Sequence, residues 1–96
     1  MLAVQKSGAF SVVIEGVTEK LAIKLCKLAK IKTIGIGASA KCSGQVLVTE
    51  DMLGIFDKTA KFVKKYNNLR DEISKSVKKY SSDIVNKKFP TKNNIY

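Results

Sequence analysis

An apolar run near the start of the chain, Ala9–Ile14, is interrupted only by Ser11. Gly8 precedes the run and Glu15-Gly16 follows it. A short apolar run without alternation is typical of a strand that is covered on both faces, as in a parallel sheet. Because parallel strands need crossover segments between them, this run predicts an α/β fold.

The segments around this strand predict short helices and further strands. Leu2–Ser7 has the pattern of the last turns of a helix that stops at a glycine. Thr18 is a predicted cap of an amphipathic helix that ends near Lys30. Thr33–Gly37 and Gln45–Thr49 are two more predicted strands. The order of elements favours a parallel sheet.

The link between the last two strands is short. Nine residues separate Ile36 from Val46, whereas a parallel crossover usually takes at least about 10–12. The spacing alone therefore leaves an antiparallel pair open at this point.

A long helix is predicted from Thr59 to about Val85. Its apolar residues recur at intervals of three or four and form one stripe: Phe62, Tyr66, Leu69, Ile73, Val77, Tyr80 and Ile84. The two tyrosines of the stripe are expected in a core. Pro90 and two asparagines after it end the ordered part and leave a polar tail over residues 90–96.

The charge is strongly basic, with 18 Lys and Arg against eight Asp and Glu and a net charge of +10. Nucleic acid, an acidic membrane surface and an acidic protein are therefore possible partners. All the basic residues except Arg70 are lysines, although arginine is expected where phosphate or guanine is bound in bidentate fashion. A solvated face is the favoured interpretation of the helix lysines Lys61, Lys64, Lys65, Lys75, Lys78 and Lys79.

Cys26 and Cys42 are the only cysteines, and the chain has no histidine. This excludes a disulfide-stapled mini-domain and a zinc site of the usual kind, and predicts a reducing, cytoplasmic setting. The start of the chain has no signal-peptide pattern, and no apolar run approaches the ~20 residues of a membrane span. We therefore expect a soluble protein without a membrane partner.

The segment Gly35–Ala40 matches the dinucleotide pattern G-x-G-x-x-G/A. That pattern binds a pyrophosphate only where a helix follows the glycines. Here Gly44 and another predicted strand follow instead. Close packing of backbone at a strand end is the favoured interpretation.

Glu15 is the candidate catalytic residue, because α/β folds place their chemistry at the carboxyl ends of their strands. A carboxylate there can act as a general base, and a solvated turn residue is the other interpretation. Glu50-Asp51 follows the last predicted strand and has the same ambiguity. These strand ends supply only part of the oxygen ligands that a hard metal needs.

Several blocks of the sequence, taken in order, resemble one enzyme family. They are residues 8–17, 33–38, 44–48, 51–54 and 61–64, with Tyr66, Tyr80 and Phe89-Pro90. The resemblance is to the ketopantoate hydroxymethyltransferases and extends over essentially the whole chain.

The resemblance implies a (β/α)₈ barrel of the TIM type, for which ~250 residues are typical. Residues 1–96 are then a partial barrel domain, the C-terminal third of that fold, from strand six to the long closing helix. Such a piece has open strand edges. We expect it to be poorly stable and inactive on its own.

The implied reaction moves a hydroxymethyl group from 5,10-methylenetetrahydrofolate to the 2-oxo acid 3-methyl-2-oxobutanoate, giving 2-dehydropantoate for pantothenate and coenzyme A synthesis. Glu15 aligns with the general base of the family. The Mg²⁺ ligands and a substrate lysine of the family belong to earlier strands, outside this chain. The family is homo-oligomeric, and a separate N-terminal portion is an implied partner.

The chain departs from the family pattern at five positions. Lys32 stands for a usual proline, Ser39 for a glycine, Ser43 for an aspartate, and Glu50 and Asn94 for histidines. The changes suggest relaxed loop geometry and altered charge near the barrel top. A split enzyme, a truncated remnant and a small basic binding module for nucleic acid or an acidic partner all remain open.

Overall fold

The computed structural model describes all residues, 1–96. Its elements are α1 (Leu2–Lys6), β1 (Ser11–Glu15), α2 (Glu19–Leu28), β2 (Lys32–Ile36), β3 (Gly44–Gln45), α3 (Thr49–Met52), α4 (Leu69–Val85) and the 3₁₀ turn η1 (Lys92–Asn94). The α/β class and the order of the first four elements are confirmed.

The three strands form one parallel sheet in the order β1-β2-β3. Glu15 pairs with Ile36, and Gly44 pairs with Ile34. The antiparallel pairing that the short link left open is therefore wrong. Gly44 pairs with Ile34, which lies only two residues before the end of β2. The link 37–43 therefore spans a short distance back along β2, and it can do so without a helix.

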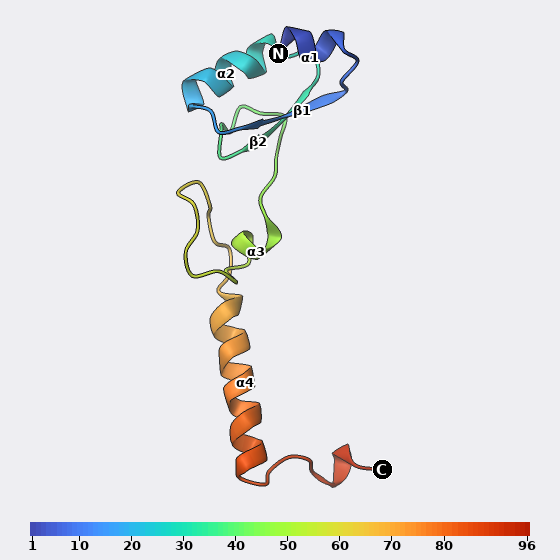
Figure 1. The fold of residues 1–96 in the computed structure, drawn as a ribbon, viewed down its shortest axis with the longest axis vertical. Coiled ribbons are helices and arrows are strands. Elements are labelled where there is room, and N and C mark those ends of the chain that lie inside the picture. The colour runs from blue at the N-terminus through green and yellow to red at the C-terminus, as the bar shows by residue number, and fades with distance from the viewer.

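One face of the sheet is covered by α2, and Figure 1 shows α1 and α2 together on that side. The Thr18 Oγ1 accepts a hydrogen bond from the Leu21 N–H at 3.4 Å and caps α2, as predicted. Ala22 on this helix is fully buried. The small core contains Ile14, Ala22, Ala38 and Cys42.

The other face of the sheet is open. The Val13 side chain is 54% exposed, whereas its neighbour Ile14 is 4% exposed. Successive side chains of a strand point to opposite faces, so Val13 and Glu15 share the open face. The prediction that β1 is covered on both faces is wrong, because helices cover only one side.

The third strand is shorter than the predicted Gln45–Thr49. It spans Gly44–Gln45, and one further hydrogen bond joins the Val46 N–H to the Gly35 carbonyl at 2.9 Å. β2 ends at Ile36, and Gly37 turns the chain away with φ +59°. No partner is left beside residues 47–49, so the ladder stops there.

The long helix begins at Leu69, ten residues after the predicted start. The preceding segment packs back on the region around α3 instead. The Tyr66 N–H donates to the Met52 carbonyl at 2.8 Å, and the Leu69 and Arg70 N–H groups donate to the Leu53 and Gly54 carbonyls at 3.0 and 3.1 Å. These bonds replace the ones that the same three N–H groups would donate to residues 62, 65 and 66 in a continuous helix.

α4 extends away from the sheet (Figure 1). None of its residues is buried. Tyr66 and Tyr80 are 68% and 57% exposed, so their predicted place in a core is wrong. The Tyr80 ring packs edge-on against the Phe89 ring, with centroids 5.7 Å apart. The polar tail predicted over residues 90–96 contains η1, in which Thr91 and Asn94 cap one another.

The chain is open and elongated. Its radius of gyration is 22.1 Å, whereas a compact chain of this length has about 12.5 Å. Its accessible surface is 7887 Å², against roughly 5,400 Å² for a compact monomer of this mass. The apolar stripe of α4 and one sheet face therefore lack a covering layer.

Candidate active site at the carboxyl ends of the strands

Glu15 is the last residue of β1, at the strand end where the sequence places it, and its side chain is exposed. It lines a pocket of about 500 Å³ at the carboxyl ends of β1 and β2. The other lining residues are Gly16, Val17, Ile36, Gly37, Lys61 and Phe62. The register places Ile36 beside Glu15 on the open face of the sheet.

The segment before α4 completes this pocket. Phe62 lies directly against the backbone of Gly37, where a side chain would collide with it. Gly37 adopts φ +59°, a conformation that favours glycine. Residues 61 and 62 therefore reach the strand ends because they are not part of a helix.

Lys61 was counted among solvated helix lysines in the sequence, and its place in this pocket was missed. A carboxylate and an ammonium group thus line one pocket without forming an ion pair. The ion pairs of the chain are Arg70–Asp57, at 2.7 Å, and Lys75–Glu72, at 3.9 Å. The sequence around Lys61 gives no sign of this position, because the apolar residues on both sides of Lys61 continue the spacing of the predicted helix.

Glu50 and Asp51 do not line the pocket of Glu15. They lie in the first turn of α3, away from the strand ends where the sequence placed them. No three His, Cys, Asp or Glu side chains of the chain lie close enough together to hold a metal ion. The residues of this chain do not fit a magnesium site.

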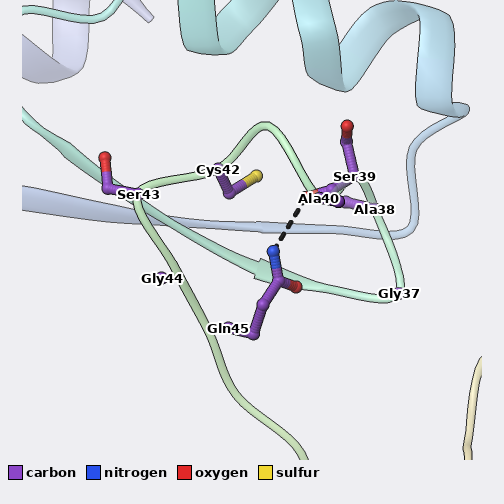
Figure 2. Close-up of a pocket in the computed structure, with 8 residues that line it drawn as sticks. All are labelled: Gly37, Ala38, Ser39, Ala40, Cys42, Ser43, Gly44 and Gln45. Atoms are coloured by element: carbon purple, nitrogen blue, oxygen red, sulfur yellow. Dashed lines mark hydrogen bonds between the residues drawn. The ribbon is translucent and has the colours of Figure 1, made fainter.

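The glycine-rich link after β2 forms a second pocket, shown in Figure 2, with no charged side chain in it. The Gln45 Nε2 donates to the Ser39 carbonyl at 2.8 Å across this link (Figure 2). The backbone N–H groups of Lys41 and Cys42 donate to Ser39 itself. No helix follows the glycines, so the dinucleotide pattern is not a phosphate site.

Close packing is the role of the first glycine in that pattern. A Cβ on Gly35 would lie 2.9 Å from the Gln45 Oε1 and 3.0 Å from the Cys42 Sγ. This agrees with the interpretation as tight backbone packing.

The lysines that the sequence assigns to one helix lie in two segments, because Lys61, Lys64 and Lys65 precede α4 and Lys75, Lys78 and Lys79 lie on it. The Lys65 Nζ donates to the Phe56 and Asp57 carbonyls, and the Lys64 Nζ lies 4.9 Å from the centroid of the Tyr66 ring. Lys75 pairs with Glu72. Three of these lysines therefore have contacts within the chain.

Residues that depart from the family pattern are accommodated locally. The Ser43 Oγ accepts from the Thr33 N–H at 3.3 Å, and the Ser43 N–H donates to the Thr33 Oγ1 at 3.1 Å. Ser39 is buried and does not have a positive φ, so its backbone does not require glycine. Asn94 caps η1, Lys32 is exposed at the start of β2, and Glu50 is exposed on α3.

None of the helices has both the length and the apolar character that crossing a membrane requires.

Comparison with known proteins gives one consistent result. A family model described as ketopantoate hydroxymethyltransferase matches residues 1–92. A 3-methyl-2-oxobutanoate hydroxymethyltransferase of Maricaulis maris is 48% identical over 95 residues, which are 99% of this chain and 34% of that protein. The protein of the same name from Sphingopyxis alaskensis is 50% identical over 95 residues, covering 99% and 33%.

A third relative, 3-methyl-2-oxobutanoate hydroxymethyltransferase 2 of Zymomonas mobilis, is 54% identical over 92 residues, covering 96% of this chain and 34% of the relative. The chain therefore spans about a third of the length of the curated relatives it matches.

Proposed function

The chain belongs to the ketopantoate hydroxymethyltransferase family, and we propose that it supplies the C-terminal third of a (β/α)₈ barrel that transfers a hydroxymethyl group. The donor is 5,10-methylenetetrahydrofolate, and the acceptor is 3-methyl-2-oxobutanoate. The product, 2-dehydropantoate, enters pantothenate synthesis. The proposed setting is the cytoplasm.

One observation carries this proposal. Glu15 stands at the carboxyl end of β1, on the uncovered face of a parallel sheet, in a pocket it shares with Lys61. In a closed barrel the uncovered face is the interior, and its carboxyl end is where barrel enzymes place their reacting groups. The apolar neighbours Val13 and Ile36 suit an interior packed by side chains.

Glu15 is proposed as the general base. The hydrogen on the carbon next to the ketone of 3-methyl-2-oxobutanoate is acidic because the resulting carbanion is an enolate. The Glu15 carboxylate takes this proton, and the electron pair of the broken C–H bond becomes the nucleophile toward the one-carbon donor. The Lys61 ammonium places positive charge in the pocket, which favours an anionic substrate.

The remaining parts of the reaction need groups that this chain does not supply. Magnesium, which stabilises enolate oxygen when bound, would be held by residues outside these 96, because no suitable cluster exists here. We propose that the other two thirds of the barrel cover the open sheet face. Homo-oligomer formation is proposed for the completed barrel.

The test is a chimera in which this chain replaces the matching third of the Maricaulis maris relative. Deuterium exchange into 3-methyl-2-oxobutanoate, measured by NMR, isolates the proton-transfer step from the folate step. We expect the chimera to catalyse the exchange. Glu15→Gln should lower the rate by about 10²–10⁴-fold, as loss of a general base does.

Glu72→Gln is the matched control, because it removes the same charge from exposed α4. It should leave the exchange rate unchanged. A folded chimera without exchange activity would refute the proposal for this chain. Undiminished exchange in Glu15→Gln would remove Glu15 from the reaction while leaving the barrel proposal intact.

The size of the native polypeptide decides how the barrel is completed. An immunoblot against residues 62–80, with mass spectrometry of the band, measures it in the source cells. A band near 10.5 kDa requires a separate partner chain. A band about two and a half times heavier places Glu15 inside one continuous barrel.

A further inference from the structure

The two cysteines of the chain lie side by side in the fold. Cys26 is on α2 and Cys42 is in the link between β2 and β3, and they are 16 positions apart in the sequence. Their Sγ atoms are 3.3 Å apart, and both thiols are free. A disulfide has its sulfurs about 2.05 Å apart, so bond formation requires an approach of only about 1.3 Å.

The surrounding backbone holds the Cys42 thiol in this place. Gly35 of β2 leaves the space that the Cys42 Sγ occupies. The Cys42 N–H donates to the Ser39 carbonyl at 3.2 Å, and the Gln45 Nε2 donates to the same carbonyl. The fold therefore presents the two sulfurs to one another before any reaction.

The two thiols differ in their access to solvent. Cys26 is half-buried and lines a surface pocket of about 470 Å³ with Ile23, Lys27 and Lys41. Neither lysine takes part in an ion pair. Cys42 is buried, and its burial, followed by its hydrogen bond with Cys26, raises the pKa of the Cys42 thiol. An external reagent therefore reaches Cys26 first.

We propose that Cys26 and Cys42 form an oxidation site at which an anionic low-molecular-mass disulfide, such as oxidised glutathione, joins them reversibly. The Cys26 thiol loses its proton to water, and its sulfur attacks the reagent. The S–S bond of the reagent breaks and one reduced glutathione leaves. The Cys42 sulfur, deprotonated in turn, attacks the Cys26 sulfur and releases the second reduced glutathione.

The complete reaction is one thiol–disulfide exchange that transfers two electrons. The two protein thiols are oxidised to one disulfide, and oxidised glutathione is reduced to two thiols. The new bond ties α2 to the link that lines the pocket in Figure 2. This inference concerns the described fold alone and does not depend on the proposed enzyme activity.

The test compares how readily the internal disulfide forms in the folded chain and in the unfolded chain. The full 96-residue chain is diluted to a concentration at which sedimentation shows a monomer. It is then equilibrated with mixtures of reduced and oxidised glutathione, in buffer and in guanidinium, quenched, alkylated and weighed by mass spectrometry. The equilibrium constant for the internal disulfide should be at least about tenfold larger in buffer. Equal constants, or disulfide-linked dimers as the main product, would overturn the proposal.

Single variants test the order of attack. Cys42→Ser should accumulate a glutathione adduct on Cys26. Cys26→Ser should form its adduct on Cys42 at least about ten times more slowly, because that thiol is buried and burial raises its pKa. Equal rates in buffer would contradict this order.

The pair Lys27→Gln and Lys41→Gln tests recognition of the reagent. The double variant should slow the reaction of Cys26 with oxidised glutathione several-fold and leave its reaction with neutral hydroxyethyl disulfide unchanged. Equal slowing with both reagents would overturn the role of the two lysines.

Discussion

Phe62 packs against the backbone of Gly37 so closely that any side chain on Gly37 would collide with it. The contact joins the segment before α4 to the end of β2. It brings Lys61 to the pocket of Glu15. The shape of the candidate site therefore depends on a residue without a side chain.

Gly37→Ala is expected to disrupt this contact. The new Cβ meets Phe62, and φ +59° is unfavourable for alanine. We expect a loss of about 1–3 kcal/mol from the free energy of unfolding, seen as a lower urea midpoint of the chimera. Gly44→Ala is the control, because its Cβ meets no atom within 4 Å. Similar midpoints for both variants would contradict the contact.

Lys61→Met is expected to weaken substrate binding. The substitution keeps the length of the side chain and removes the ammonium group that lines the pocket with Glu15. In the chimera the KM for 3-methyl-2-oxobutanoate should rise about tenfold, the typical effect of losing one charge-assisted contact, while kcat changes little. Lys58→Met, outside the pocket, should leave KM unchanged. Equal KM values in the two variants would remove Lys61 from binding.

Short sequence patterns correctly predicted the helices and strands whose ends depend on neighbouring residues. Thr18 caps α2, as predicted. Within the predicted strand run Ala9–Ile14, residues 11–14 belong to β1. Glu15 lies where a strand-end carboxylate was expected. These features depend on neighbours in the sequence, so sequence alone could locate them.

Features set by distant partners were predicted wrongly. The stripe from Phe62 to Ile84 has one helical period, yet Asn68 occupies the N-cap position of α4. The N–H groups of Tyr66, Leu69 and Arg70 donate to carbonyls of residues 52–54 instead of to a preceding helical turn. Asn67-Asn68, followed by Asp71 in the first helical turn, was the available signal for the true start. β3 is short because β2 ends beside it, which its own residues do not reveal.

The isolated chain is expected to associate. One sheet face is open, and Phe10 is 88% exposed and Val13 54% exposed. Uncovered apolar surface and open strand edges promote association. Sedimentation should show an average mass that rises with concentration, and calorimetry should show a broad transition. Concentration-independent, cooperative melting of a monomer would contradict this expectation.

Binding to polyanions should follow the total charge of the chain. A net charge of +10 produces attraction that weakens steeply with salt. Lys78→Glu with Lys79→Glu, on α4, and Lys20→Glu with Lys24→Glu, on α2, each change the charge by the same amount at exposed positions.

Both double variants should elute from heparin at equally reduced salt, because a solvated charged surface has no preferred face. A much larger shift for the α4 variant would instead identify that helix as a binding surface. Two exposed tyrosines, Tyr80 on that helix and Tyr66 in the segment before it, would then be tested as stacking groups by substitution with leucine, which keeps apolar packing and removes the ring.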